Sequence, residues 1–246
     1  MKTKVIIMNS FKGFHVARDN FYNFFDAICN SAVNSGNDLQ IASFQATEPP
    51  QVKDQMNRYM LKWNYPWNGE VVRDMQSGLT KTGYQTAVPA KRMACFLSHY
   101  RLWMECAEAG EPYLILEHDA RFQNKIDPDF LASRDEWIIS VNQPQPGCTP
   151  KALAYEKAIV NFGGQKGQRV VPVPAIATFD VPAGLPGNSA YYIKPQGAKK
   201  MIELAREYGA WPNDALMCRQ LVGADKMGCL YPFVTRIADT GSSTST

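Results

Sequence analysis

The chain has 246 residues, of which 45% are hydrophobic and 20% are charged, and its formal net charge is +3. This composition is close to the globular average and excludes disordered, collagen-like and coiled-coil chains. The weak positive charge is compatible with anionic ligands, but it does not single out nucleic acid. The length suits one domain, which we expect to span residues 1–246.

The sequence shows no pattern typical of a membrane-spanning or exported protein. No stretch approaches the roughly 20 apolar residues of a membrane span, and the apolar run at 5–8 is too short for the core of a signal peptide. Six cysteines are scattered without a C-x-x-C pair, which argues against a zinc ribbon or a disulfide framework and fits a reducing compartment. We therefore expect a cytoplasmic protein without a transmembrane segment.

Short apolar runs predict buried strands with helices between them. The runs lie at 5–8, 39–44, 113–116 and 137–141, and apolar residues at helical spacing cover 21–28. A strand, a helix and a second strand in this order favour a parallel sheet covered by helices.

The strongest helical pattern begins near Lys91. Gly110 ends this helix, and Pro112 prevents its continuation. The strand that follows leads directly into Glu117 and Asp119, so two carboxylates lie just beyond its carboxyl end. In an open α/β sheet, ligands bind in the crevice at that end of the strands. The apolar residues of the helix share one face: Met93, Phe96, Leu97, Tyr100, Met104 and Ala107.

Residues 142–187 differ in composition from the rest of the chain. They contain seven of the 16 prolines and six of the 17 glycines, which predicts a long, partly irregular insertion. A strand at 190–193 and a helix over 198–208 follow. Asn213 is placed to cap a further helix that runs through Leu221.

The carboxylates of Glu117 and Asp119 are the first candidates for chemistry. Residues two apart on an extended strand end point the same way, so both carboxylates can face one ligand. Hard oxygen ligands suit Mn²⁺ or Mg²⁺, with a bound diphosphate completing the coordination shell. Such a metal neutralises charge as a nucleotide diphosphate leaves. The alternative is that the two acids are solvated turn residues, because an E-x-D sequence is common.

Ser98 and His99 are neighbours on the central helix. Adjacent helical residues are separated by ~100° of rotation, so they do not share one narrow stripe. His99 shares its stripe with Trp103, four residues on. Because no G-x-S-x-G sequence is present, a hydrolase triad is not supported. A half-buried histidine bonded to the backbone is the alternative.

Asp214 and several aromatic residues form further candidates. Asp214 lies in the first turn of a predicted helix, where the helix dipole stabilises a carboxylate. It is also suited to act as a general base, which is typically worth ~10²–10⁴ in rate. Trp63 and Trp67, together with Trp211, are candidates for acceptor binding, because aromatic faces stack on sugar rings or bases. Core packing explains these aromatic residues equally well.

Two motifs occur in a fixed order along the chain. Residues 93–103 read MACFLSHYRLW and residues 112–122 read PYLILEHDARF; residues 187–193 read GNSAYYI, with GAKK at 197–200 and then Asp214. The pattern resembles glycosyltransferase family 25, the lipooligosaccharide galactosyltransferase-like family, in which a G-C-x-L-S-H-x-x-x-W helix precedes a strand ending E-D-D-A. In this chain, His118 replaces the middle Asp and Ala94 replaces the Gly.

The resemblance implies an α/β, GT-A-like (Rossmann-type) fold with a mostly parallel sheet flanked by helices. It also implies a nucleotide-sugar donor, usually UDP-galactose, and a divalent metal, Mn²⁺ or Mg²⁺. Glu117 and Asp119 match the family's metal and nucleotide motif, and Asp214 matches its C-terminal acid, which we expect to be the base of an inverting hexosyl- or pentosyltransferase. Lys12 and Arg18 follow the first strand and are placed to reach a diphosphate, and plain surface charges are the alternative. The other candidate donor-binding residues are Ser98, His99, Arg101, Asn188 and Ser189.

The acceptor is open at this point. One version is an oligosaccharide, as in lipooligosaccharide biosynthesis; another is a hydroxymethylated base in DNA, as for some bacteriophage enzymes. A different class of protein, a non-catalytic module that binds a nucleotide-sugar or a glycan, is supported only by the change at His118. A metal-dependent hydrolase has little support, because the chain lacks the further His/Asp clusters of a two-metal centre.

Overall fold

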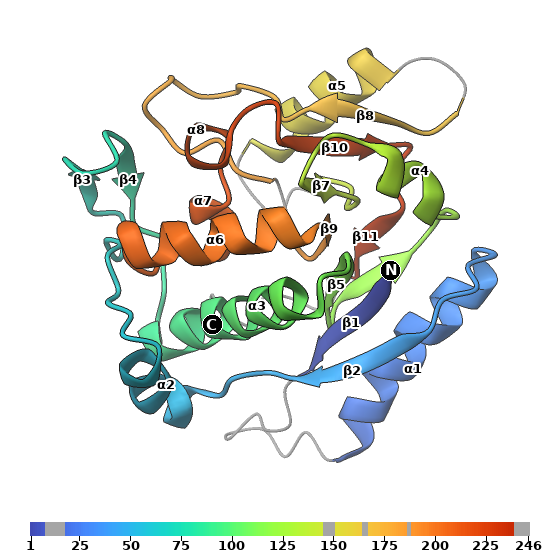
Figure 1. The fold of residues 1–246 in the computed structure, drawn as a ribbon, viewed down its shortest axis with the longest axis horizontal. Helices are drawn as coiled ribbons and strands as arrows, with labels where there is room; N and C mark the ends of the chain where they lie inside the picture. Colours follow the sequence, from blue (N-terminus) through green and yellow to red (C-terminus); the bar gives the residue numbers. More distant parts are fainter. Residues whose placement is uncertain (8–17, 145–150, 164–166, 186–187, 239–246) are drawn as a thin grey trace.

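A seven-stranded sheet forms the centre of the computed structural model, which describes residues 1–7, 18–144, 151–163, 167–185 and 188–238 (Figure 1). The strand order is β2-β1-β5-β9-β7-β10-β8. Strands β2, β1, β5, β7 and β10 run parallel to one another, while β9 and the edge strand β8 are antiparallel to their neighbours. The bounds are β1 Lys2–Ile7, β2 Ile41–Gln45, β5 Tyr113–Glu117, β7 Ile138–Ser140, β8 Arg169–Pro172, β9 Ala190–Ile193 and β10 Met227–Tyr231.

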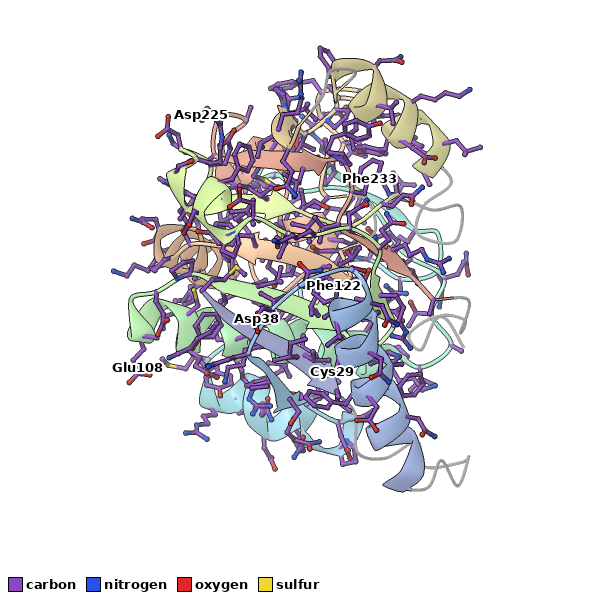
Figure 2. The ribbon with its side chains drawn as sticks, turned by 90° about the vertical axis from the view of Figure 1, so that its right-hand side faces the viewer. Cys29, Asp38, Glu108, Phe122, Asp225 and Phe233 are labelled. Carbon is purple, nitrogen blue, oxygen red and sulfur yellow. The ribbon has the colours of Figure 1, made fainter. Side chains whose placement is uncertain are left out.

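Helices cover both faces of this sheet. The long helices α3 and α6 pack side by side on one face, and α1 lies on the other (Figure 1). Figure 2 shows α1, which carries Cys29, beside the short strand that carries Phe122. The helices are α1 Arg18–Asn34, η1 Pro49–Gln51, α2 Val52–Arg58, α3 Pro89–Ala109, α4 Pro128–Ser133, α5 Ala152–Gly163, α6 Pro195–Glu207, α7 Asn213–Leu216 and α8 Arg219–Val222.

The alternation of side chains along β5 explains why both faces need a cover. Tyr113 and Ile115 belong to the apolar cluster under α3 and α6, whereas Leu114 and Leu116 belong to the cluster under α1. A strand buried on both faces is apolar throughout and is typical of a parallel sheet between helices. Only its last residue, Glu117, is charged, and it lies at the edge of the sheet where ligands bind in such folds.

Two small two-stranded sheets border the central one. Strands β3 (Val71–Arg73) and β4 (Thr80–Thr82) form a hairpin, and β6 (Ala120–Phe122) pairs with β11 (Thr235–Ile237). The second pair brings the C-terminal part of the chain to the end of β5, because the backbone N–H of Ala238 donates to the carbonyl of Asp119 at 2.8 Å.

The predicted parallel α/β sheet is confirmed, and so are its strands near 39–44, 113–116, 137–141 and 190–193. The first strand is confirmed through Ile7, and residue 8 lies outside the described part of the chain. No helix in the described ranges combines the length and the apolar character that a bilayer crossing demands.

The structure adds detail to one local prediction and contradicts another. Within the segment 142–187, predicted to be partly irregular, the described residues contain α5 and the edge strand β8, joined by irregular chain. The helix predicted from Asn213 through Leu221 is two short helices, α7 and α8, separated where Met217 leaves helical geometry at ψ 65°. Pro212, not Asn213, occupies the N-cap position of α7, and it has no side chain able to accept a capping hydrogen bond.

Candidate functional site

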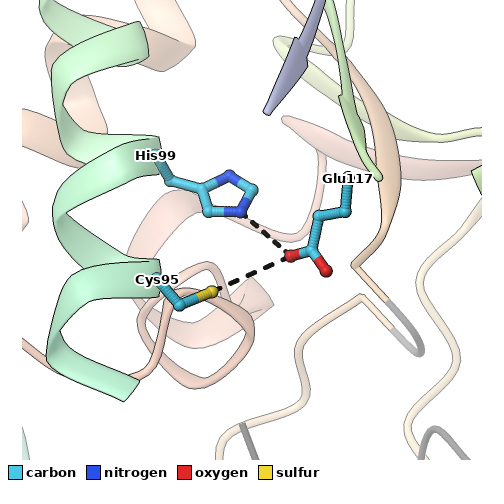
Figure 3. A group of neighbouring side chains, drawn as sticks. All are labelled: Cys95, His99 and Glu117. Carbon is cyan, nitrogen blue, oxygen red and sulfur yellow. Dashed lines mark hydrogen bonds and ion pairs between the residues drawn. The ribbon is translucent and has the colours of Figure 1, made fainter. Parts of the chain in front are cut away.

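The carboxyl end of β5 brings together polar side chains that are distant in the sequence. Helix α3 lies over this end and presents Cys95 and His99, one turn apart, to Glu117 (Figure 3). The Nε2 atom of His99 lies 3.0 Å from Oε1 of Glu117, and the sulfur of Cys95 lies 3.9 Å from the same oxygen. The predicted pairing of His99 with Trp103 on one helical stripe is confirmed, since both contact the hydroxyl of Tyr191.

Cys95, His99 and Glu117 each offer one possible metal ligand, and these atoms lie within 4.8 Å of one another. A sulfur, nitrogen and oxygen set suits Zn²⁺ better than Mn²⁺ or Mg²⁺. In the structure, however, both ring nitrogens of His99 are engaged in hydrogen bonds. Burial, followed by the charge of Glu117, raises the pKa of the Cys95 thiol well above its ordinary value. Cys95 and His99 therefore hold the carboxylate of Glu117 in place.

Asp119 has the properties expected of a cation ligand. Burial, and then the neighbouring charge of Glu117, raise the pKa of Asp119 far above its ordinary value. Its Oδ1 atom is buried and has no hydrogen-bond partner among the residues that the structure describes. A buried carboxylate without a partner is costly unless a proton or a cation neutralises it. Strand β5 ends at Glu117, so Asp119 lies in the turn that follows and not on the extended strand that the sequence predicted. Its unpartnered oxygen and the carboxylate of Glu117 are nevertheless the hard oxygen donors that suit Mn²⁺ or Mg²⁺.

His118, between the two acids, packs elsewhere. Its ring contacts Phe24 of α1 edge-on, with 5.2 Å between the ring centroids. Burial lowers the pKa of His118, which favours the neutral ring. The histidine that replaces the usual Asp is therefore accounted for by packing against α1.

Asn188 and Ser189 lie beside the end of β5, as strand β9 begins. The N–H of Glu117 donates to the carbonyl of Ser189 at 2.7 Å. The Oδ1 atom of Asn188 and the Oγ atom of Ser189 are buried without a partner in the described part of the chain. Buried polar atoms of this kind are usually satisfied, so both are suited to bind a ligand at this edge.

Asp214 approaches the same site from α7. Its Oδ2 atom accepts a hydrogen bond from the hydroxyl of Tyr84 at 3.2 Å. Burial raises the pKa of Asp214, Arg92 acts in the opposite direction, and the charge of Glu117 raises it further. The adjacent Asn213 contacts Cys95, with 3.8 Å between Oδ1 and the sulfur, so α7 and α3 meet at the site.

The space behind Asp214 is filled by backbone. Residue 184 is glycine, and a Cβ at this position would collide with the carbonyl oxygen of Asp214. Gly184 also pairs with Cys218 in an isolated antiparallel bridge. The end of the 167–185 segment therefore fixes the position of α7 by direct contact.

Of the three candidate acceptor tryptophans, the structure brings two together. Trp63 and Trp67 are half-buried and stack with 5.0 Å between ring centroids and 8° between planes. Their loop is tied to the Asp214 region, because Asn68 N–H donates to the Tyr84 carbonyl at 3.1 Å. Trp211 has 0% exposure, so its ring has no free face for an acceptor, and core packing explains it.

The remaining predicted donor-binding residues are less suited to that role. Ser98 is buried, donates to the carbonyl of Ala94 and accepts from the N–H of Thr47. Arg101 donates to the carbonyl of Gln45 at 3.0 Å, so both side chains hold the segment after β2 against α3. Lys12 lies outside the described residues, and Arg18 is described only as the first residue of α1.

Several site residues were missed by the sequence analysis. Cys95 was detectable, because it stands four residues before His99 and hence on the same helical face. Tyr191 stands two residues after Ser189 in a motif that was recognised. Tyr84 and Arg92 carried no local signal, since Tyr84 is 130 residues from Asp214 in sequence.

Comparison with known proteins identifies the family. Residues 14–217 match the model of glycosyltransferase family 25 (LPS biosynthesis protein), and the chain belongs to this family. The family that the two sequence motifs resemble is thereby confirmed. The lipooligosaccharide biosynthesis protein lic2B of Haemophilus influenzae is 26% identical over 108 residues, which are 44% of this chain and 39% of that protein. The match therefore spans about two fifths of that relative.

Solved structures of glycosyltransferases are also similar, at a distance. Galactosyltransferase LgtC, in complex with donor and acceptor sugar analogs, aligns with 99% of this chain and 88% of its own at 10% identity and a TM-score of 0.42. Mouse xyloside xylosyltransferase 1 in its apo form aligns with 96% and 84%, at 10% identity and a TM-score of 0.38.

Proposed function

We propose that this family member is a metal-dependent glycosyltransferase that moves a sugar from a UDP-sugar, galactose-like, to an acceptor hydroxyl. The observation that carries the proposal is the pair Glu117 and Asp119 at the carboxyl end of β5, with Oδ1 of Asp119 buried and unpartnered in the described structure. Family membership supports the class of donor, and the oxygen ligands support Mn²⁺ or Mg²⁺.

Glu117 and Asp119 would hold the metal, which when bound neutralises the charge of the diphosphate leaving group. Asn188 and Ser189 offer their unpartnered polar atoms to the donor from the neighbouring strand. His99 and Cys95 keep the Glu117 carboxylate in position through Oε1. The donor side of the site is thus built from β5, α3 and the start of β9.

Asp214 is the proposed base of an inverting reaction. The acceptor oxygen forms a bond to the anomeric carbon while the bond to the diphosphate oxygen breaks and its electron pair leaves with the diphosphate; the hydroxyl proton passes to Asp214. Tyr84 binds Oδ2 and so orients the carboxylate. The pKa of Asp214, raised by burial, makes this carboxylate a better proton acceptor than an exposed one.

Trp63 and Trp67 form the proposed acceptor platform. Their stacked rings are half-buried in a loop that is hydrogen-bonded to residue 84, next to the proposed base. Flat aromatic faces bind the apolar faces of sugar rings. The family description and the name of the matched relative favour a glycan of the lipooligosaccharide type, and they give no support to a modified-DNA acceptor.

Free cysteines among the described residues agree with the proposed cytoplasmic location.

A donor and acceptor screen tests the proposal. UDP-galactose, UDP-glucose and UDP-xylose are compared by thermal shift with and without Mn²⁺, since a ligand that binds only the native state raises its stability by about 2.7 kcal/mol at 100 times Kd. Product formation is then followed with lipooligosaccharide glycans and with hydroxymethylated DNA. Metal-dependent stabilisation and transfer to a glycan are expected. Donor binding without transfer to any acceptor would indicate a non-catalytic binding module, and transfer to DNA that weakens steeply with salt would reassign the acceptor.

A further inference from the structure

A chain of buried hydrogen bonds ends on the carboxylate of Glu117. The indole Nε1 of Trp103 lies 2.9 Å from the hydroxyl oxygen of Tyr191, and this oxygen lies 2.8 Å from Nδ1 of His99. His99 then reaches Glu117 through Nε2 at 3.0 Å. Trp103 and Tyr191 have 0% exposure and His99 has 1%, so water does not compete for the bonds that join these three side chains.

The chemistry of the four groups fixes the direction of every bond. An indole N–H only donates, so Tyr191 accepts from Trp103. The tyrosine hydroxyl has a single proton, and its remaining hydrogen-bonding neighbour in the described part of the chain is Nδ1 of His99, so it donates there. Nδ1 is then the acceptor, the imidazole proton lies on Nε2, and Nε2 donates to Glu117. In this arrangement each donor has one acceptor.

The opposite tautomer is disfavoured at both ends. With the proton on Nδ1, the lone pair of Nε2 would face the carboxylate of Glu117, and both would be acceptors. The hydroxyl proton of Tyr191 would also lose its acceptor in a fully buried place, which typically costs about 1–3 kcal/mol. The buried hydroxyl therefore selects the histidine tautomer.

We propose that Tyr191 and Trp103 are positioning residues that lock His99 in the Nε2–H tautomer, so that His99 always donates to Oε1 of Glu117. In the described structure, the hydrogen bonds to this carboxylate use Oε1 alone. Oε2 is left to face the metal and donor, a consequence that rests on the proposed function. Neither aromatic residue needs to touch substrate for this role.

The neighbouring tyrosine provides a matched control. Tyr192 follows Tyr191 on β9, is equally buried, and faces the opposite side of the sheet, in the cluster under α1. Its hydroxyl has no hydrogen-bond partner among the described residues. Tyr192→Phe thus removes a buried hydroxyl from the same strand without breaking the chain, whereas Tyr191→Phe removes the link between Trp103 and His99.

The first test reads the tautomer directly. Nitrogen-15 NMR of the imidazole rings is recorded on the metal-free protein, which has only three histidines, and His99 is assigned with His99→Gln. We expect the Nε2–H form in the wild type and in Tyr192→Phe. In Tyr191→Phe only Glu117 still favours this form, so we expect a measurably smaller fraction of it, with the remainder Nδ1–H or doubly protonated. An Nδ1–H or doubly protonated His99 in the wild type overturns the proposal, and so does an unchanged tautomer in Tyr191→Phe. The wild-type measurement decides even if Tyr191→Phe does not fold.

The second test separates positioning from general destabilisation. Tyr191→Phe should weaken UDP binding in the presence of Mn²⁺ and lower kcat by about tenfold, which corresponds to about 1.4 kcal/mol, with an unchanged KM for the acceptor. Tyr192→Phe should change the affinity for UDP and the kcat by less than about twofold. His99→Gln, whose amide still donates, should retain more activity than His99→Ala. Equal losses in the two tyrosine variants contradict the proposal. The expected tautomer in a chain that transfers no sugar would refute the proposed function alone.

Discussion

Tyr84 donates its hydroxyl to Oδ2 of Asp214 at 3.2 Å, and this contact joins the aromatic loop to helix α7. The backbone of Tyr84 also accepts from Asn68, next to Trp67, and its ring lies 4.8 Å below the guanidinium of Arg92. One residue therefore contacts both the proposed acceptor platform and the proposed base. The geometry between platform and base depends on this tyrosine.

Tyr84→Phe tests that relationship. Removal of the hydroxyl frees Oδ2 of Asp214 and leaves the loop intact, so kcat should fall by roughly tenfold, the usual worth of a hydrogen bond to a charged group, while the KM for the donor stays constant. Steady-state kinetics with donor and acceptor varied in turn measures kcat and the KM for the donor separately. Tyr231→Phe, at the end of β10, is the control and should match the wild type. A Tyr84→Phe enzyme with wild-type kcat would show that the orientation of Asp214 does not limit the reaction.

Substitution of the three tryptophans should have two different effects, one on acceptor binding and one on the stability of the fold. Trp63→Ala and Trp67→Ala remove a half-buried stacked pair, and we expect an increase in the KM for the acceptor of about tenfold with little change in donor binding. Trp211→Ala empties a fully buried position and should destabilise the fold by about 3–5 kcal/mol. Urea denaturation and acceptor kinetics distinguish the two outcomes. Unchanged acceptor kinetics in both loop variants would remove the proposed platform.

The carboxyl group of Asp214 should lower the free energy of unfolding as pH rises. Burial raises its pKa in the folded state above the unfolded value of 3.8, so the folded state binds this proton more tightly. The resulting stabilisation is complete below the unfolded pKa and is lost as pH rises through the folded pKa. Asp214→Asn does not titrate, so its stability relative to the wild type should increase from about pH 4 towards neutrality. Denaturation curves at several pH values measure the difference.

Asp180 provides a control of opposite sign. Its pKa is lowered by a hydrogen bond from Thr80 first, with a smaller contribution from Arg73. Its stabilisation is present above the unfolded pKa and is lost as pH falls through the folded pKa. Asp180→Asn should therefore be less stable than the wild type at neutral pH, and the difference should disappear in acid. If the stability difference from the wild type changed with pH in the same direction in Asp214→Asn and Asp180→Asn, the opposite pKa shifts assigned to the two carboxyl groups would be contradicted.

The core of the donor site was predictable because its signals are local. An apolar run ending in Glu117 and Asp119 marks a buried strand with acids at its carboxyl end, and the structure has β5 there. Gly110 ends the preceding helix with a φ of 67°, a left-handed conformation that favours glycine. Each of these features is encoded within a few neighbouring residues.

The features that the sequence did not predict depend on contacts between segments that are distant along the chain. Strand β10 was missed because Gly228 interrupts its apolar run, and the reason for this glycine is the close approach of Val170 on β8. Trp211 and Trp63 look alike in sequence, but Lys81 covers the ring of Trp211, with Nζ 4.5 Å from its centroid. Lys81 lies on β4, 130 residues from Trp211 in sequence, so no pattern near either tryptophan distinguishes the buried ring from the half-buried one.

The central claim is that Glu117 and Asp119 together hold a cation that binds the donor diphosphate. Electron paramagnetic resonance of free Mn²⁺, titrated with protein in the presence and absence of UDP, measures this binding directly. We expect UDP to increase Mn²⁺ binding by the wild type and by Asp129→Asn, an exposed acid on α4, and Asp119→Asn to weaken the binding at least about tenfold. Wild-type affinity for Mn²⁺ and UDP in Asp119→Asn would contradict the account.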